Sequence, residues 1–270
     1  MSTFKINQEG KPSLSAEQVL SFQQKGAIHL SGVASREEMS FFRPAINEAV
    51  KKNNTETRKM EERDTYGKAF LQVMNLWQAD ERVRKFTLHN KFANIAAQLL
   101  GVDRVRIYHD QALYKEAGGG ATPWHQDQYY WPLDTQKTVT MWMPLIDIDV
   151  PMGMLTFAEG SHKDGLVKSI PISDESQSLL EAYVAEKGYP IFRPDFMEAG
   201  DATFHYGHTL HKAPGNSSNQ LREVMTIIYY ADGSVITKPE NDAQEADRLR
   251  WFDGMNPGEL AASYLNPVVE

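Results

Sequence analysis

The sequence predicts a mainly β fold with flanking α-helices, in which helices between about residues 15 and 100 pack on a β-core of about residues 102–235. The first part contains amphipathic stretches with helix-capping signals. The later part contains short runs of alternating or β-branched residues separated by Gly and Pro, a pattern typical of a sandwich or a barrel. With a C-terminal extension over residues 236–270, the chain fits one domain of residues 1–270.

Capping signals place the expected helices. Ser15-Ala16-Glu17-Gln18 resembles a capping box and starts a helix that ends near Gly26, and residues 27–30 follow as a short strand. Ser35 opens a second helix that runs to about residue 52. A third helix is expected over residues 79–100, because Gly101 is well placed to end it. The polar residues 51–67 between the last two helices predict a mobile loop.

Five later segments predict strands. Residues 102–114 alternate between apolar and polar side chains, and residues 138–146 and 223–230 are rich in β-branched and aromatic residues. Residues 154–157 and 202–205 are shorter candidates of the same kind. Both histidine-containing motifs described below fall in this β part, so we expect the functional site there.

Composition excludes several classes of function. The net charge of −8 argues against a protein that tracks a nucleic-acid backbone, and the absence of Cys leaves neither a disulfide framework nor a thiolate metal site. Residues 1–10 lack the apolar run of a signal peptide, and no segment is apolar enough to span a bilayer. We therefore expect a cytoplasmic protein without nucleic-acid or membrane partners. The sequence leaves the oligomeric state open.

Two histidines and a carboxylate form a candidate metal site. On an extended strand His125 and Asp127 point to the same side, where one ion can contact both. With His211 they would complete the two-His, one-carboxylate ligand set of non-haem Fe(II) oxygenases, which leaves open positions for a co-substrate and O2. His205 is an alternative to His211, since both share a face on an extended strand, whereas His208 points away.

Three groups of residues resemble the phytanoyl-CoA dioxygenase family. The resemblance covers nearly the whole chain, and it implies a double-stranded β-helix (jelly-roll, cupin-like) core with Fe(II), 2-oxoglutarate and O2 as the reacting partners. The matching segments are Trp124-His125-Gln126-Asp127 with the following Gln128-Tyr129-Tyr130-Trp131-Pro132, Gly153-Met154-Leu155-Thr156-Phe157 leading to Gly160-Ser161-His162, and Gly200-Asp201 leading to Leu210-His211-Lys212-Ala213, Asn216 and Arg222.

The resemblance also implies roles for single residues. His125, Asp127 and His211 become the iron ligands and thereby the catalytic residues. Arg222 becomes the partner of the distal carboxylate of 2-oxoglutarate, a role that suits a guanidinium because its planar fork can hold both oxygens. The position of Trp142 implies that it lines the co-substrate pocket.

Other positions have weaker support. The resemblance places Gln111 at another co-substrate contact, across a loop of variable length. Gln72 and Asn75 are further candidates for this pocket, but they are not included in the predicted set of contacts. Residues 129–131 either line the substrate pocket or pack the core, and His162 is read as structural. Three segments are lid candidates, namely residues 53–64, residues 118–120 and residues 173–189.

The implied function is the hydroxylation of an unactivated C–H bond of a small organic substrate, with release of succinate and CO2. Family members that halogenate carry a small residue in place of the carboxylate, so Asp127 favours hydroxylation here. One alternative is a non-catalytic jelly-roll protein that binds a small molecule at a vestigial metal site. Another is a zinc hydrolase with the same three ligands, which would have no need of Trp142 or Arg222.

Overall fold

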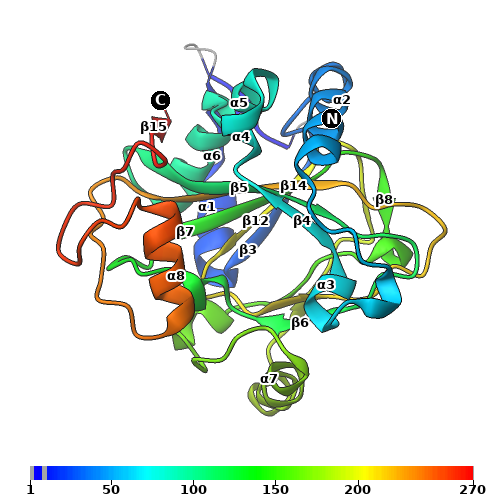
Figure 1. Ribbon diagram of the computed structural model, residues 1–270. Helices are drawn as coiled ribbons and strands as arrows, with labels where there is room; N and C mark the ends of the chain where they lie inside the picture. Colours follow the sequence, from blue (N-terminus) through cyan, green and yellow to red (C-terminus); the bar gives the residue numbers. More distant parts are fainter. Residues whose placement is uncertain (1–2, 8–10, 270) are drawn as a thin grey trace.

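Two antiparallel sheets face each other in the computed structural model, which describes residues 3–7 and 11–269 (Figure 1). The larger sheet has the order β15-β5-β14-β7-β12-β3, and β4 pairs with the other end of β5. Its strands are β3 (Ala27–Leu30), β4 (Leu71–Met74), β5 (Val105–Tyr114), β7 (Thr138–Pro144), β12 (Ala202–Tyr206), β14 (Val224–Ala231) and β15 (Val268–Val269).

The smaller sheet has the order β10-β9-β13-β6 and closes one side of the jelly roll. Its strands are β6 (Thr122–His125), β9 (Thr156–Ala158), β10 (Ile191–Phe192) and β13 (His211–Ala213). Two further strand pairs join β1 (Lys5–Ile6) with β2 (Pro12–Ser13) and β8 (Ile148–Asp149) with β11 (Phe196–Met197). The predicted jelly-roll fold with flanking helices is confirmed.

The helices gather mainly outside the larger sheet. The α-helices are α1 (Ala16–Lys25), α2 (Arg36–Asn53), α3 (Thr65–Ala69), α4 (Leu76–Ala79), α5 (Glu81–Thr87), α6 (Asn90–Leu100), α7 (Asp174–Lys187) and α8 (Asp242–Trp251). Short 3-10 turns are η1 (Met60–Glu62), η2 (Asp127–Tyr130), η3 (Val150–Met152) and η4 (Ser161–Asp164). In Figure 1, α7 lies beside β6 and the smaller sheet, and α8 lies at the opposite flank from α3.

Capping explains where the N-terminal helices begin and end. Complete capping boxes at Ser15 and Ser35 start α1 and α2, and Gly26 ends α1 in the left-handed conformation, as expected. The single helix expected over residues 79–100 is wrong. The Asp80 side chain accepts hydrogen bonds from the backbone N–H groups of Arg82 and Val83 in α5, and His89 caps α6 in the same way. Residue 79 therefore ends α4, and the rest of the segment divides into α5 and α6.

Two expected loops are also partly wrong. Residues 51–67 contain the end of α2, the turn η1 and the beginning of α3. Residues 173–189 contain α7, which Ser173 caps through a capping box and Gly188 ends in the left-handed conformation. Of the N-terminal segment searched for a signal peptide, residues 1–2 and 8–10 lie outside the described residues. Across the described ranges, no helix is long and apolar enough to cross a membrane.

The two faces of the larger sheet have different partners. Met141, Phe204 and Ile227 point to the face that packs on the helices, in one large apolar cluster with residues of α1, α2, α5 and α6. Because side chains alternate along a strand, Trp142 and Thr226 point to the other face, toward the smaller sheet. The strands therefore supply a core on one side and a row of site residues on the other.

Asp110 on β5 connects the larger sheet to α4 and α5 through hydrogen bonds, and a substitution there measures their contribution to stability. It is fully buried, and its carboxylate accepts hydrogen bonds from the backbone N–H groups of Leu76 and Trp77 (2.8 and 2.9 Å) and from the Thr87 hydroxyl (2.7 Å). Asp110→Asn places an NH2 group against these donors and should lower the free energy of unfolding by about 1–3 kcal/mol in urea denaturation. Asp103→Asn, at an exposed position, is the control. Equal stability of both variants would contradict this role.

Candidate active site

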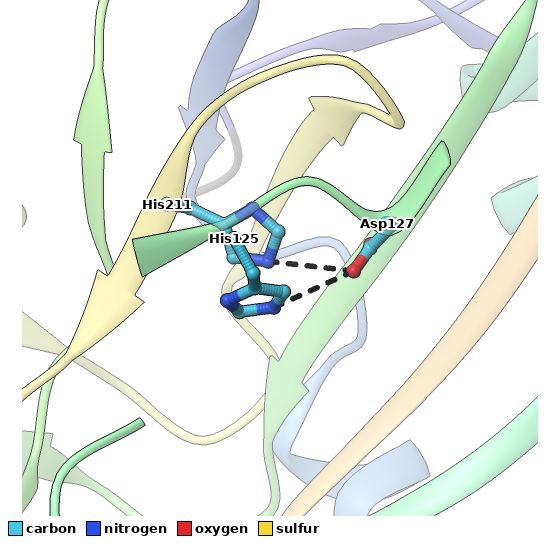
Figure 2. Close-up of side chains that lie close together, drawn as sticks. All are labelled: His125, Asp127 and His211. Atoms are coloured by element: carbon cyan, nitrogen blue, oxygen red, sulfur yellow. Dashed lines mark ion pairs between the residues drawn. The ribbon is translucent and has the colours of Figure 1, made fainter. Parts of the chain in front are cut away.

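His125, Asp127 and His211 meet between the two sheets (Figure 2). His125 ends β6 and His211 begins β13, and the register of these strands places the two residues directly opposite each other. The Nε2 atoms of both histidines lie 3.6 Å from Asp127 Oδ1, and the three candidate ligand atoms lie within 4.8 Å of one another. This separation suits three ligands that contact one metal ion.

Asp127 reaches this position from a turn rather than from a strand. The strand β6 ends at His125, and Asp127 is the first residue of η2, so the expected strand is one step too long. Gln126 between them is still extended, at φ −126° and ψ 126°, so both side chains remain on one side. The Gln126 amide donates in the other direction, to the carbonyls of Gly165 and His208.

Backbone carbonyls fix the tautomers of both histidines. Nδ1–H of His125 donates to the carbonyl of Pro123 (2.8 Å), and Nδ1–H of His211 donates to the carbonyl of Thr209 (2.9 Å). The lone pair of each ring is therefore on Nε2, the atom that faces Asp127. Burial lowers the pKa of His125 to about 3 and that of His211 to about 4, so both rings are neutral at pH 7, as metal ligation requires.

Two hydrogen bonds orient the Asp127 carboxylate through its other oxygen, Oδ2. The Thr140 hydroxyl donates to Oδ2 (2.9 Å), and so does Nε2–H of His205 (3.3 Å). Burial alone would raise the pKa of Asp127, but the electrostatic interaction with the His211 ring and the hydrogen bond from His205 hold it well below its usual range. The carboxylate is therefore ionised, with Oδ1 turned toward the two histidines.

These contacts assign different roles to His205, His208 and His211. His205 lies on β12, with its ring 4.3 Å from the ring of His211, and it orients Asp127 instead of joining the group of three. His208 does not line the cavity described next. Sequence reasoning missed Thr140, although its place two residues before Trp142 on the same strand face was a usable signal.

A cavity of about 340 Å³ lies around the candidate metal site, within the range of small-molecule sites. Both sheets contribute to its walls, together with α3, η2 and α8. The residues that line it are Tyr66, Phe70, Gln72, Met74, His109, Gln111, Leu113, Thr122, His125, Asp127, Tyr130, Trp131, Thr140, Trp142, Leu155, Ile172, His205, His211, Ala213, Arg222, Thr226, Ile228, Ala243, Ala246, Asp247 and Trp251.

Arg222 is a buried cation in the wall of this cavity. Only 2% of the residue is exposed, its Nη1–H donates to the carbonyl of Gly153, and its guanidinium carbon lies 5.3 Å from the centre of the Trp142 ring. Its Nε–H has no partner within the described ranges, and no carboxylate there pairs with it. Burial lowers its pKa to about 9, which still leaves the group charged at pH 7. A buried guanidinium with free donors is a site for an anionic ligand.

The other residues expected in the pocket divide into two groups. Gln111 and Trp142 line the cavity beside Thr226, and the Gln72 amide donates to Gln111 Oε1 (2.6 Å), so Gln72 also reaches the cavity wall. Asn75 does not line this cavity, and its side chain accepts a hydrogen bond from Trp77 instead.

The aromatic residues 129–131 and the three lid candidates contribute unequally to the cavity wall. Tyr130 and Trp131 line the cavity, whereas Tyr129 does not. Ile172, immediately before α7, lines the cavity, and its backbone N–H donates to the Tyr130 hydroxyl (3.2 Å). No residue of the segments 53–64 and 118–120 is among the lining residues.

A model of the phytanoyl-CoA dioxygenase family matches residues 22–224, more than half of the chain. The chain belongs to the phytanoyl-CoA dioxygenase family. The sequence is 28% identical over 173 residues to phytanoyl-CoA dioxygenase domain-containing protein 1 of Danio rerio, an alignment that covers 62% of this chain. The aligned part spans 58% of that relative's length.

Solved structures of similar fold match almost the whole chain. The non-haem alpha-ketoglutarate-dependent carbocyclase SnoK from nogalamycin biosynthesis superposes with a TM-score of 0.78 at 25% identity, covering 96% of this chain and 97% of that chain. The epimerase SnoN, in complex with Fe3+, alpha-ketoglutarate and nogalamycin RO, superposes with a TM-score of 0.76 at 21% identity, covering 94% and 98%. The second likeness concerns the fold alone.

Thr140→Val tests the support of the candidate metal ligand. The variant keeps the shape of the side chain but removes the hydroxyl that donates to Asp127. We expect the Kd for Co(II), followed by visible absorption, to rise about 10–100-fold, as is typical when a group that orients a ligand is lost. Thr226→Val is the matched control, since this cavity residue donates to the Gln111 carbonyl and not to Asp127. An unchanged Kd in Thr140→Val would show that the hydroxyl does not support the ligand.

Proposed function

We propose that this protein is a non-haem Fe(II)- and 2-oxoglutarate-dependent dioxygenase that hydroxylates an unactivated C–H bond of a small organic substrate and releases succinate and CO2. The observation that carries the proposal is that the candidate metal ligands and the unpaired, buried Arg222 line one cavity. A metal site alone would need no buried cation, whereas a diacid co-substrate needs both. The family and the alpha-ketoglutarate-dependent neighbours support the same assignment.

The donor set fits ferrous iron. Two neutral imidazoles present Nε2, and one ionised carboxylate presents Oδ1, as in the facial arrangement that leaves other coordination positions open. We propose His125, Asp127 and His211 as the ligands. The chain orients them before any ion binds, because Pro123, Thr209 and Thr140 already hold the three side chains.

The wall of the cavity around Arg222 fits the second carboxylate of 2-oxoglutarate. Arg222 would bind this carboxylate through the donors that the chain leaves free, and the Trp142 ring holds the guanidinium plane in place. Gln111, positioned by Gln72, would line the co-substrate from β5 of the larger sheet. A diacid with one end at the metal and the other at the guanidinium would account for a cation and a metal site in one cavity.

Bound iron and 2-oxoglutarate would supply an oxidant able to attack a C–H bond, with O2 providing one oxygen atom to the product and one to succinate. The residues of the chain would bind the iron and the co-substrate, orient them, and protect the site from water. Tyr66, Phe70 and Trp131 give the cavity apolar walls that exclude bulk water. Asp127 as a ligand favours hydroxylation over halogenation. The carbocyclase and epimerase names of the neighbours belong to those proteins.

Arg222 provides a direct test of the co-substrate site. Arg222→Lys keeps a positive charge but loses the planar fork, and Arg222→Gln loses the charge as well. We expect the Kd for 2-oxoglutarate, measured from the visible charge-transfer band of the anaerobic Fe(II) complex, to rise about tenfold in the first variant and about 100-fold in the second. Arg36→Lys, on the exposed surface, is the control. An unchanged affinity for 2-oxoglutarate in both Arg222 variants would contradict the assignment of the co-substrate site.

Turnover separates an oxygenase from the two alternatives. The protein with Fe(II) should convert 2-oxoglutarate to succinate slowly even without substrate, and only when O2 is present. His211→Ala should abolish this activity and also the extra thermal stability that 2-oxoglutarate confers in the presence of metal. His208→Ala, which alters a histidine outside the cavity, should keep both. Stabilisation without succinate would favour a binding protein, and neither effect with metal bound would favour another metal chemistry.

A further inference from the structure

The cavity contains a second carboxylate, away from the metal ligands. Asp127 and Asp247 are the only carboxylates among its described lining residues, and Asp247 comes from α8 in the C-terminal extension. The same helix face contributes Ala243, Ala246 and Trp251, at the spacing of successive helical turns. The two alanines are small, so the helix backbone lies close to the cavity. Asp247 therefore belongs to the wall of the cavity and is only partly buried.

Two aromatic side chains fix the orientation of the Asp247 carboxylate. The Tyr108 hydroxyl donates to Oδ2 (2.7 Å), and Nε1–H of Trp251 donates to Oδ1 (3.2 Å). Each oxygen keeps a further lone pair for another donor. His109 packs beside the same indole, with 4.9 Å between ring centres, so the surroundings of this carboxylate are aromatic rather than charged.

In the described residues no Lys, Arg or His makes an ion pair with Asp247. The guanidinium of Arg250 lies over the Trp251 ring, at 4.3 Å, and its charge is the weakest of the influences that lower the pKa of Asp247. Burial dominates and raises that pKa to about 7. A desolvated carboxylate without a cation is costly in a folded protein, and such groups gather where a ligand completes the pair.

Aromatic side chains line the same cavity as this carboxylate. Tyr66 from α3 and Tyr130 from η2 are both lining residues, as Asp247 is. Trp131 and Trp251 complete the aromatic surroundings. A carboxylate with aromatic rings around it is a combination that binds an organic cation, through an ion pair and through cation–π contacts.

We propose that Asp247 pairs with a protonated amine of the substrate, so that the substrate class of the proposed dioxygenase is a small amine with an apolar body. The proposal rests on the proposed function, and it adds a specificity-determining residue to it. The family model ends at residue 224, so α8 lies outside the part that this chain shares with the family model. A determinant at this place selects the substrate without changing the metal site or Arg222.

The test compares three probes of similar shape and different charge, namely phenethylamine, phenethyl alcohol and phenylacetate. Their binding to the anaerobic protein with Fe(II) and 2-oxoglutarate is followed by calorimetry and by the change in the charge-transfer band. The wild type should bind the amine at least about tenfold more tightly than the other two probes. Asp247→Asn should lose this preference while it keeps its affinity for 2-oxoglutarate. Asp242→Asn, an exposed change on the same helix, should behave like the wild type.

The dependence on pH gives a second measurement. Phenethylamine stays protonated between pH 6 and 8, whereas Asp247 loses its charge as the pH falls through about 7, so amine affinity should fall toward pH 6. The neighbouring phenols and the His109 imidazole do not titrate in this window. Burial raises the pKa of Tyr66, Tyr108 and Tyr130 and lowers that of His109 to about 4. Asp247→Asn should remove this pH dependence.

Each result bears on one proposal. A wild type that binds the amine no better than the alcohol, or that binds neither, overturns the amine proposal, and so does an Asp247→Asn variant that keeps the preference. The comparison of amine and alcohol binding uses the wild type alone, so it tests the proposal even if the variant fails to fold. A missing charge-transfer band with metal bound would instead count against the dioxygenase, and amine selectivity can still be measured by calorimetry on that protein.

Discussion

The pairing of β13 with β6 is the constraint on which the site depends. His125 and His211 are far apart in the sequence, and the backbone register alone brings them face to face. A slip of one residue would turn one ring away from the other, because neighbouring side chains on a strand point to opposite faces. The carbonyls of Pro123 and Thr209 then orient the rings, each from two residues before its own histidine. The same strands thus set both the separation of the ligands and their tautomers.

Buried charges in this cavity fall into two kinds. Asp127 is stabilised by the chain itself, through Thr140, His205 and the two candidate co-ligands. Arg222 and Asp247 have neutral partners, so the chain leaves a buried cation and a buried acid without opposite charges. Such groups lower the stability of the protein without a ligand. Their presence in one cavity is best explained by ligands of opposite charge, a diacid for the guanidinium and an amine for the carboxylate.

Much of the fold could be predicted from local signals, and the failures have local causes. The capping boxes at Ser15 and Ser35 gave correct helix starts because their hydrogen bonds lie within four residues. The break at His89 was missed because the sequence offers no glycine or proline stop before Gly101, although the His89 side chain caps a new helix. In the site, motif spacing indicated the candidate metal ligands and Arg222. Thr140 had a local signal in its spacing from Trp142, whereas the contact of His205 with Asp127 depends on the pairing of β12 with β7, which no local pattern reveals.

Asp247 shows a different limit of the sequence. Its segment carries no motif, and an acidic residue in an amphipathic helix normally faces solvent. It becomes a cavity residue only because α8 packs on η2, where the side chains of Asn241 and Gln244 donate to the carbonyl of Tyr129. Since η2 begins with Asp127, the helix that would select the substrate is tied to the turn that carries a candidate metal ligand. An amine held by Asp247 would therefore lie in the cavity that the candidate metal ligands also line, and α8 connects its binding residue to the turn that carries Asp127.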